Sequence, residues 1–343
     1  MTREERPMPL DAAPIEPARP IIDPHLHFWD IRHWGPGAPE MQLFLFDQVR
    51  ACIAASGHAV THSVFVECHA MHRADGPEER RALGETEFAN GMAAMCASGL
   101  YGPARLCHRI VGNADLRGGQ AVRPLLEAHC AAAVERFRGI RMNTVHSAEG
   151  LFGQPCDPAL AGVLRDPAFV AGARVLADMD LSLDVWCTHT QIADVAALAD
   201  AVPDLTIVLD HLGTPVVHGR NVARQDEVLA EWRAAIVDLA RRPNVVIKLG
   251  GMGMDVTGPM GAQAGSAASH ELAEAWRTRV DLCIDAFSPA RAMFESNFPP
   301  DRAAATYGAV WNAFKRLAKG YSEDEKDMLF RGTAARTYRI AIA

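Results

Sequence analysis

Short, nearly continuous apolar runs alternate along this chain with segments in which apolar residues recur every three or four positions. Runs of this kind are typical of parallel strands that are covered on both faces, and the spaced pattern is typical of amphipathic helices. Eight apolar runs are present, at 21–28, 62–70, 106–116, 137–143, 181–188, 205–213, 244–251 and 291–298. The helical pattern occupies 84–98, 122–134, 191–202, 226–242, 270–287, 303–318 and 322–340. The last of these is predicted to be a closing pair of helices with Ser322 as N-cap.

Strand–helix alternation repeated eight times predicts an α/β protein with a closed parallel (β/α)8 barrel, the TIM-barrel architecture. The main rival is an open doubly wound sheet, but no G-x-G-x-x-G turn follows the first strand, which disfavours a dinucleotide-binding fold. We predict one barrel domain over 20–343. The charged, proline-rich residues 1–19 are predicted to form a flexible N-terminal arm.

Four predicted loops are longer than the usual connection, and all four follow strands. They span 29–42, 71–83, 144–158 and 252–268. Loops after the strands of a barrel lie at its C-terminal face, where active sites of this fold are built. We therefore expect these loops to shape a pocket for a small-molecule substrate.

Charge, hydropathy and cysteine content indicate which classes of binding partner the protein can have. The formal net charge of −8 argues against a nucleic-acid partner, which usually needs a basic face. Neither an uninterrupted apolar stretch of membrane-spanning length nor a signal-peptide pattern occurs, so no membrane association is expected. The 8 cysteines are scattered without a C-x-x-C pair, which is typical of reduced thiols in a cytoplasmic protein. The sequence is compatible with a homo-oligomer and does not determine the oligomeric state.

Histidines mark the ends of two predicted strands. His25 and His27 are two residues apart at the end of the first strand, so both point into the barrel mouth. Two such imidazoles can bind one divalent ion or hydrogen-bond to a carbonyl oxygen, and the plain alternative is a pair satisfied by local hydrogen bonds. His211 ends the sixth strand at the same level of the barrel and could instead be structural.

These residues stand in three motifs that together carry a resemblance. D-x-H-x-H occupies 23–27, V-x-D-H-x-G occupies 208–213, and M-F-x-S-x-x-P occupies 293–299. In this order the motifs resemble the amidohydrolase superfamily, in particular the branch that contains sugar-lactone hydrolases and 2-pyrone-4,6-dicarboxylate lactonase. The resemblance runs from about residue 20 to the end of the chain. It implies the (β/α)8 barrel of the metal-dependent hydrolases and, for this branch, lactone hydrolysis with or without a metal.

One position departs from that pattern. Relatives in this branch usually have aspartate where this chain has Asn297, and that aspartate serves as the base or binds the metal. An amide is a poor base, so another carboxylate would have to take the proton. Asp301 and Glu67 are equal candidates for this role, and Glu295 would share a face with Asn297 if the strand persists. Asp301 could equally be a helix N-cap.

Further candidates line the predicted pocket. Arg141 ends the fourth strand, where related lactonases often have a substrate-binding arginine, and the alternative is a salt bridge with Glu67. Trp186 lies near the end of the predicted fifth strand and His189 follows that strand, and both could line the substrate pocket. Thr190 could equally cap the next helix. Two more features are left open: Lys248 is either a pocket residue or a buried lysine paired with an acid, and His69 and His72 lie in the second long loop.

The favoured interpretation is a hydrolase that opens a lactone or related cyclic ester of a small acid. His25, His27 and Arg141 would stabilise the oxyanion, His211 would orient water, and Asn297 would bind substrate beside the base. One divalent ion, zinc or manganese, could be held by the three histidines, or the reaction could be metal-independent. The alternatives are a metal-dependent decarboxylase of an aromatic or unsaturated acid, a hydrolase of an amide or another ester, and a barrel that binds without catalysis.

Overall fold

The computed structural model describes residues 13–34, 39–148, 150–258 and 265–342. Parts of three of the predicted long loops (35–38, 149 and 259–264) and most of the predicted arm (1–12) lie outside these residues. Residues 13–19 contact helix α9 (Tyr307–Leu317), where the Ile15 amide donates to Asn312 Oδ1 at 2.7 Å and Lys315 Nζ donates to the Glu16 carbonyl at 2.8 Å.

Eight parallel strands form one sheet in chain order, as the apolar runs predicted. They are β1 (Ile21–Leu26), β4 (Val60–Val66), β5 (Arg105–Gly112), β6 (Phe137–Asn143), β7 (Ser182–Trp186), β8 (Ile207–Leu209), β9 (Val245–Leu249) and β10 (Ala292–Phe294). A parallel bridge between Leu26 and Phe298 joins the first strand to the segment after the last, which closes the barrel. A small antiparallel pair, β2 (Trp29–Asp30) and β3 (Leu43–Phe44), follows β1.

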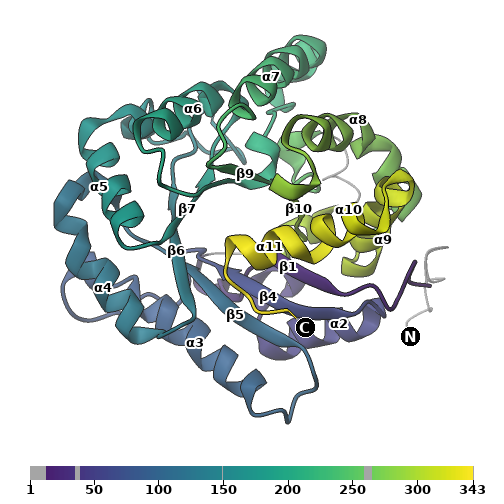
Figure 1. The fold of residues 1–343 in the computed structure, drawn as a ribbon, viewed down its shortest axis with the longest axis horizontal. Coiled ribbons are helices and arrows are strands. Elements are labelled where there is room, and N and C mark those ends of the chain that lie inside the picture. Colours follow the sequence, from purple (N-terminus) through teal and green to yellow (C-terminus); the bar gives the residue numbers. More distant parts are fainter. Residues whose placement is uncertain (1–12, 35–38, 149, 259–264, 343) are drawn as a thin grey trace.

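Helices surround the sheet and cover its outer face (Figure 1). Besides α9 they are α2 (Phe46–Ser56), α3 (Leu83–Ala97), α4 (Arg123–Ala132), α5 (Pro167–Asp178), α6 (Ile192–Ala201), α7 (Gln225–Leu239) and α8 (Ser269–Phe287), with the short α1 (Pro39–Gln42) near β3. The sequence pattern did not predict α2 or α5. In α5 a glycine interrupts the pattern: a Cβ at Gly172 would lie 2.5 Å from the Leu116 carbonyl oxygen, so close packing requires the weak helix former.

The C-terminal helices close one end of the barrel. Helix α10 (Glu323–Asp327), one π-helical turn and α11 (Thr333–Thr337) follow one another without a break, so one continuous helical segment stands where a pair of helices was predicted. The predicted N-cap is present, since the Ser322 hydroxyl caps α10 by accepting from the Glu325 amide. In Figure 1 this segment crosses the strands beside β1 and β10. Side chains that point into the barrel, among them Val64, Val111 and Met293, pack against Tyr338 and Ile340 of this segment. This C-terminal segment, here called the C-terminal plug, fills the N-terminal half of the barrel. The active site of such a barrel lies at the opposite, C-terminal end of the strands.

Candidate active site

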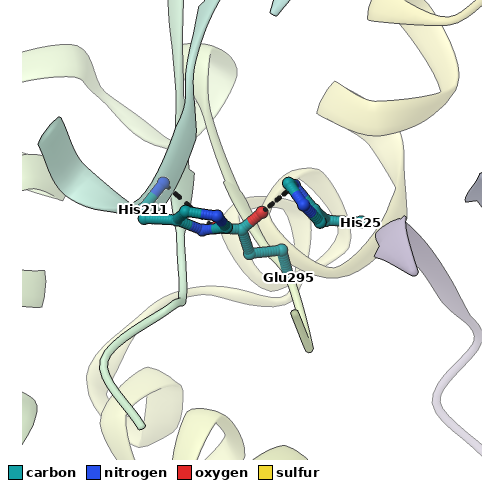
Figure 2. Close-up of side chains that lie close together, drawn as sticks. All are labelled: His25, His211 and Glu295. Carbon is teal, nitrogen blue, oxygen red and sulfur yellow. Dashed lines mark hydrogen bonds and ion pairs between the residues drawn. The ribbon is translucent and has the colours of Figure 1, made fainter. Parts of the chain in front are cut away.

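Three side chains meet at the C-terminal ends of the strands. Glu295 Oε1 lies 2.7 Å from His211 Nδ1, and Glu295 Oε2 lies 2.8 Å from His25 Nδ1. Figure 2 shows the Glu295 carboxylate between the two imidazole rings. All three residues are buried, and one ligand atom from each lies within 4.8 Å of the others. Burial alone would raise the pKa of the Glu295 carboxyl, but its contacts with His211 and His25 bring that pKa below its usual range.

His25 and His27 lie on the same side of the barrel mouth, as their spacing predicted. Their Nε2 atoms are 3.2 Å apart, and the rings meet edge to face. His27 Nδ1 is 2.8 Å from the Val66 carbonyl oxygen, which assigns the proton of this ring to Nδ1 and leaves a lone pair on Nε2. Burial, followed by the charges around His25 and Arg141, lowers the pKa of His27, so the ring is neutral. His27 therefore presents an acceptor nitrogen toward His25.

His211 reaches this cluster through an unusual backbone. Strand β8 ends at Leu209, and His211 follows with φ of 54°, in the left-handed region. Because of this turn, both the backbone amide and the ring of His211 reach Glu295 Oε1, the amide at 3.1 Å. Gly251 makes room for the ring: its φ is 67°, and a Cβ there would lie 2.4 Å from His211 Cγ. A glycine is required at this position by both conformation and space.

Buried charges of both signs surround His25. Lys248 Nζ lies 2.7 Å from Asp184 Oδ2 and 3.0 Å from Asp210 Oδ1. The same ammonium is 3.1 Å from His25 Nδ1. The open question about Lys248 is thereby answered: it is a buried lysine paired with acids, and it also borders the site. The Tyr338 hydroxyl donates to Asp184 Oδ2 at 2.7 Å, which links the network to the C-terminal plug.

Arg141 forms the alternative salt bridge with Glu67 and also contacts His25. Its Nε donates to Glu67 Oε1 at 2.7 Å, and its Nη1 lies 3.2 Å from His25 Nε2. A further contact of 3.6 Å joins Nη1 to Asp210 Oδ2. Glu67 is thus engaged in a buried ion pair with the Arg141 guanidinium.

The segment after β10 differs from the expectation. The strand ends at Phe294, so Glu295 and Asn297 do not share a strand face, and Asn297 has φ of 49°. Asn297 Nδ2 donates to Asp301 Oδ1 at 2.8 Å, and the Gly253 amide donates to Asp301 Oδ2 at 3.0 Å. Asp301 is therefore no helix N-cap, since Thr306 caps the next helix. Burial raises the pKa of the Asp301 carboxyl to about 7 despite these hydrogen bonds.

Trp186 and His189 differ in their relation to the cluster. The Trp186 ring lies edge to face with His211 at 6.2 Å between centroids, and its Nε1 donates to Thr214 Oγ1 at 3.2 Å. The contacts of His189 are with the Val216 amide, at 3.3 Å from Nδ1, and with Glu231 at 4.0 Å. Thr190 is not the cap of the next helix, because the capping box there starts at Thr188.

The donor set fits one divalent metal ion. Two imidazoles and a carboxylate are ligands that zinc and manganese accept. Around these ligands, the carboxyl groups of Glu67, Asp184, Asp210 and Glu295 outnumber the basic side chains of Arg141 and Lys248 by two. A divalent cation would balance that excess. Glu295, predicted only as a possible base, is the third candidate ligand beside His25 and His211. His27, which was predicted as a ligand, lies next to this set, with its Nε2 at 3.2 Å from His25 Nε2.

Two residues of the buried network were missed in the sequence. Asp210 precedes His211 in the sixth-strand motif, and Asp184 interrupts the apolar run of the fifth strand. A carboxylate inside a strand that is otherwise apolar is a signal for a buried charge pair, because an unpaired one would be too costly. The identity of its partner, Lys248, depends on the closure of the sheet and could not be read from the pattern.

The family model described as "Amidohydrolase" matches residues 22–340. This chain belongs to that family and is an enzyme of the amidohydrolase type, as the three motifs indicated. Within the described part of the chain, no helix combines the length and the apolar character that a membrane span needs.

Similar proteins cover nearly the whole chain. An uncharacterised protein, y4mH of Sinorhizobium fredii, is 31% identical over 93% of this chain and 98% of its own length. An L-fucono-1,5-lactonase of Burkholderia multivorans is 30% identical over 93% of this chain and 96% of its own length. A crystal structure of an amidohydrolase from Burkholderia multivorans with bound zinc has a TM-score of 0.71 and 29% identity, and it covers 94% of this chain and 99% of its own.

Proposed function

We propose that this enzyme hydrolyses a lactone of a small sugar-derived or carboxylated hydroxy acid, with Asp301 as the proton acceptor. The observation that carries the proposal is the Asp301 carboxyl, whose pKa burial raises to about 7, at the edge of the His25–His211–Glu295 cluster. A general base works best when its pKa lies near the working pH. The L-fucono-1,5-lactonase among the similar proteins supports a sugar lactone as substrate.

Asp301 is held for this role by two donors. The Asn297 amide and the Gly253 backbone amide each bind one carboxyl oxygen, which fixes the orientation of the group and leaves lone pairs for a water molecule. In the proposed step Asp301 takes a proton from water as the oxygen attacks the ring carbonyl. The C–O ring bond then breaks, and the same proton passes to the leaving alkoxide, which gives a hydroxy acid.

Positive charge and N–H donors would stabilise the oxyanion. The Arg141 guanidinium, whose Nη1 lies 3.2 Å from His25 Nε2, would donate N–H groups to the oxyanion at the barrel mouth. The neutral His27 ring presents an acceptor at Nε2, so its role would be to orient His25. Lys248 behind His25 adds a fixed positive charge. His211 is oriented by Glu295, so its Nε2 faces away from that carboxylate and can hold the attacking water.

A metal ion would bind to His25, His211 and Glu295, with His27 beside them. When bound, zinc or manganese would polarise the lactone carbonyl and so assist Arg141. The structure of a zinc-bound relative supports such an ion. The side chain of Trp186 and the apolar cluster of Val145, Leu151, Val216, Met254 and Val256 would line the entrance against bulk water.

The test is turnover of a panel of sugar 1,5- and 1,4-lactones and pyrone dicarboxylates, measured as acid release in weak buffer. We expect at least one to be hydrolysed, and the double variant His25→Ala/His27→Ala to lose that activity while keeping its circular dichroism spectrum. Metal analysis of the purified protein, with and without chelator treatment, would show whether the histidines act through an ion.

Two results would overturn the proposal. Unchanged turnover in the double variant would place catalysis elsewhere. Failure of the whole panel, together with release of carbon dioxide from an aromatic or unsaturated acid, would favour decarboxylation on the same barrel.

A further inference from the structure

A cavity of about 530 Å³ opens at the opposite end of the barrel from the histidines. It lies where β6, β7, β8 and β9 begin, and the C-terminal segment forms one wall. Four arginines line it, together with two aspartates and uncharged groups: Arg138, Arg291, Arg336, Arg339, Asp180 and Asp204. The chain as a whole is acidic, with a formal net charge of −8, so the lining of this cavity differs in charge from the rest of the protein.

Arg138 gives the strongest indication that an anion binds in this cavity. It stands at the start of β6, and its Nη1 donates to the Phe137 carbonyl oxygen at 2.8 Å. Its Nε is buried and has no hydrogen-bond acceptor among the described residues. A buried guanidinium N–H without an acceptor is costly, and an anionic oxygen in the cavity would satisfy it.

The other arginines are only weakly neutralised by the protein. Arg339 pairs with the exposed Asp180. Arg291 donates only to backbone carbonyls, at 2.7 Å to Ala240 and at 3.0 Å to Val245, and Arg336 donates to the Ala290 carbonyl. Among the described residues that line the cavity, Arg339–Asp180 is the one ion pair, so the lining has an excess of positive charge.

Neighbouring arginines add to this field. Burial, followed by the charges of Arg138, Arg339 and Arg136, lowers the pKa of Arg109 to about 10. Burial and Arg339 likewise lower the pKa of Arg138. Mutual repulsion of this kind is relieved when an anion binds among the guanidinium groups.

We propose that this cavity is a binding site for a small phosphate-type dianion, either free phosphate or a phosphate monoester, separate from the catalytic site. Planar guanidinium groups match the geometry of phosphate oxygens and bind them bidentately. The size of the cavity suits a small molecule, and the acidic surface of the chain as a whole disfavours a nucleic acid. The proposal is independent of the reaction that the histidine cluster performs.

The experiment is calorimetric titration of the full chain with inorganic phosphate and with glycerol phosphate, in a low-salt buffer free of other oxyanions. Sodium chloride at matched ionic strength serves as the control ligand. We expect saturable phosphate binding at one site and an increase in melting temperature with phosphate. Tighter binding of glycerol phosphate would identify the ligand as an ester, and equal affinity would identify free phosphate.

Two variants separate a ligand role from a structural one. Arg138→Met and Arg336→Gln should each weaken phosphate binding at least tenfold, whereas Arg277→Gln, on the exposed face of α8, should not change it. In phosphate-free buffer Arg138→Met should melt no lower than the parent, because it removes a buried Nε–H that has no acceptor among the described residues. No phosphate effect beyond that of chloride, or full binding by both cavity variants, would overturn the proposal.

Discussion

The side-chain amide of Asn297 donates a hydrogen bond of 2.8 Å to the Asp301 carboxyl, so an amide lies directly against a carboxylic acid beside the histidine cluster. The two side chains are four residues apart and both are buried. A second ionised carboxylate in place of Asn297 would repel Asp301, because like charges at this distance cannot both be ionised at low cost. In this chain the pair is therefore one acid and one amide.

This pairing predicts the effect of exchanging the amide and the carboxyl between positions 297 and 301. Asp301→Asn should lower kcat by roughly 100-fold or more, the usual contribution of a general base. The double variant Asn297→Asp/Asp301→Asn restores one carboxyl and one amide, and it should recover at least tenfold of the loss. Steady-state kinetics on the best lactone would measure both. A double variant as inactive as Asp301→Asn would show that the proton must be taken from the Asp301 position itself.

The pKa of Asp301 also predicts a pH profile. Since the base must be ionised, kcat/KM should rise with pH and level off above about 7, and the rising limb should disappear in the residual activity of Asp301→Asn. An acidic limb unchanged in that variant would assign the limb to another group.

Stability should have the opposite pH dependence. The folded-state pKa of Asp301, about 7, is above the ordinary carboxyl value of 3.8, so the folded state binds more protons between these two pH values. The contribution of Asp301 is fully present below about pH 4 and is lost as the pH rises through about 7. Asp301→Asn should therefore be more stable than the parent at pH 8, by on the order of 1–3 kcal/mol, and less so at pH 5. Urea unfolding at the two pH values would detect this, and equal differences at both would contradict it.

Gly251 should tolerate no side chain. Gly251→Ala would place a Cβ 2.4 Å from His211 Cγ and force an unfavourable positive φ, so we expect a displaced imidazole and a loss of kcat of at least tenfold. Gly99→Ala is the matched control, since Gly99 has φ of 76° and open space around its Cβ position. The control should lose only about 1 kcal/mol of stability and no activity. Comparable activity losses in both variants would remove the case for a contact with His211.

Removal of the buried Lys248 ammonium should strongly destabilise the folded protein. Lys248→Met leaves Asp184 without its cation and Asp210 with only the longer 3.6 Å contact to Arg141, which should cost about 3–5 kcal/mol of unfolding free energy. Lys319→Met, at an exposed position, should cost almost nothing. Chemical denaturation of the two variants would compare them. A loss below about 1 kcal/mol for Lys248→Met would show that the carboxylates are protonated in the folded protein.

The sequence by itself determined the architecture of this protein. Eight apolar runs predicted the eight strands, because a strand covered on both faces must be apolar along its whole length. The H-x-H spacing placed His25 and His27 on one side of β1, because side chains alternate along a strand. The three motifs also indicated the family correctly.

Only the tertiary structure decided how the charges are paired. Glu295 could join His25 and His211 only after the sheet had closed and β10 had ended early at Phe294, and neither event leaves a periodic trace in the sequence. Asp301 and Glu67 looked equivalent as bases until the fold gave Glu67 to Arg141 and buried Asp301 against Asn297. The reactivity of an ionisable group depends on its burial and on its neighbours across the barrel, and both are properties of the folded chain.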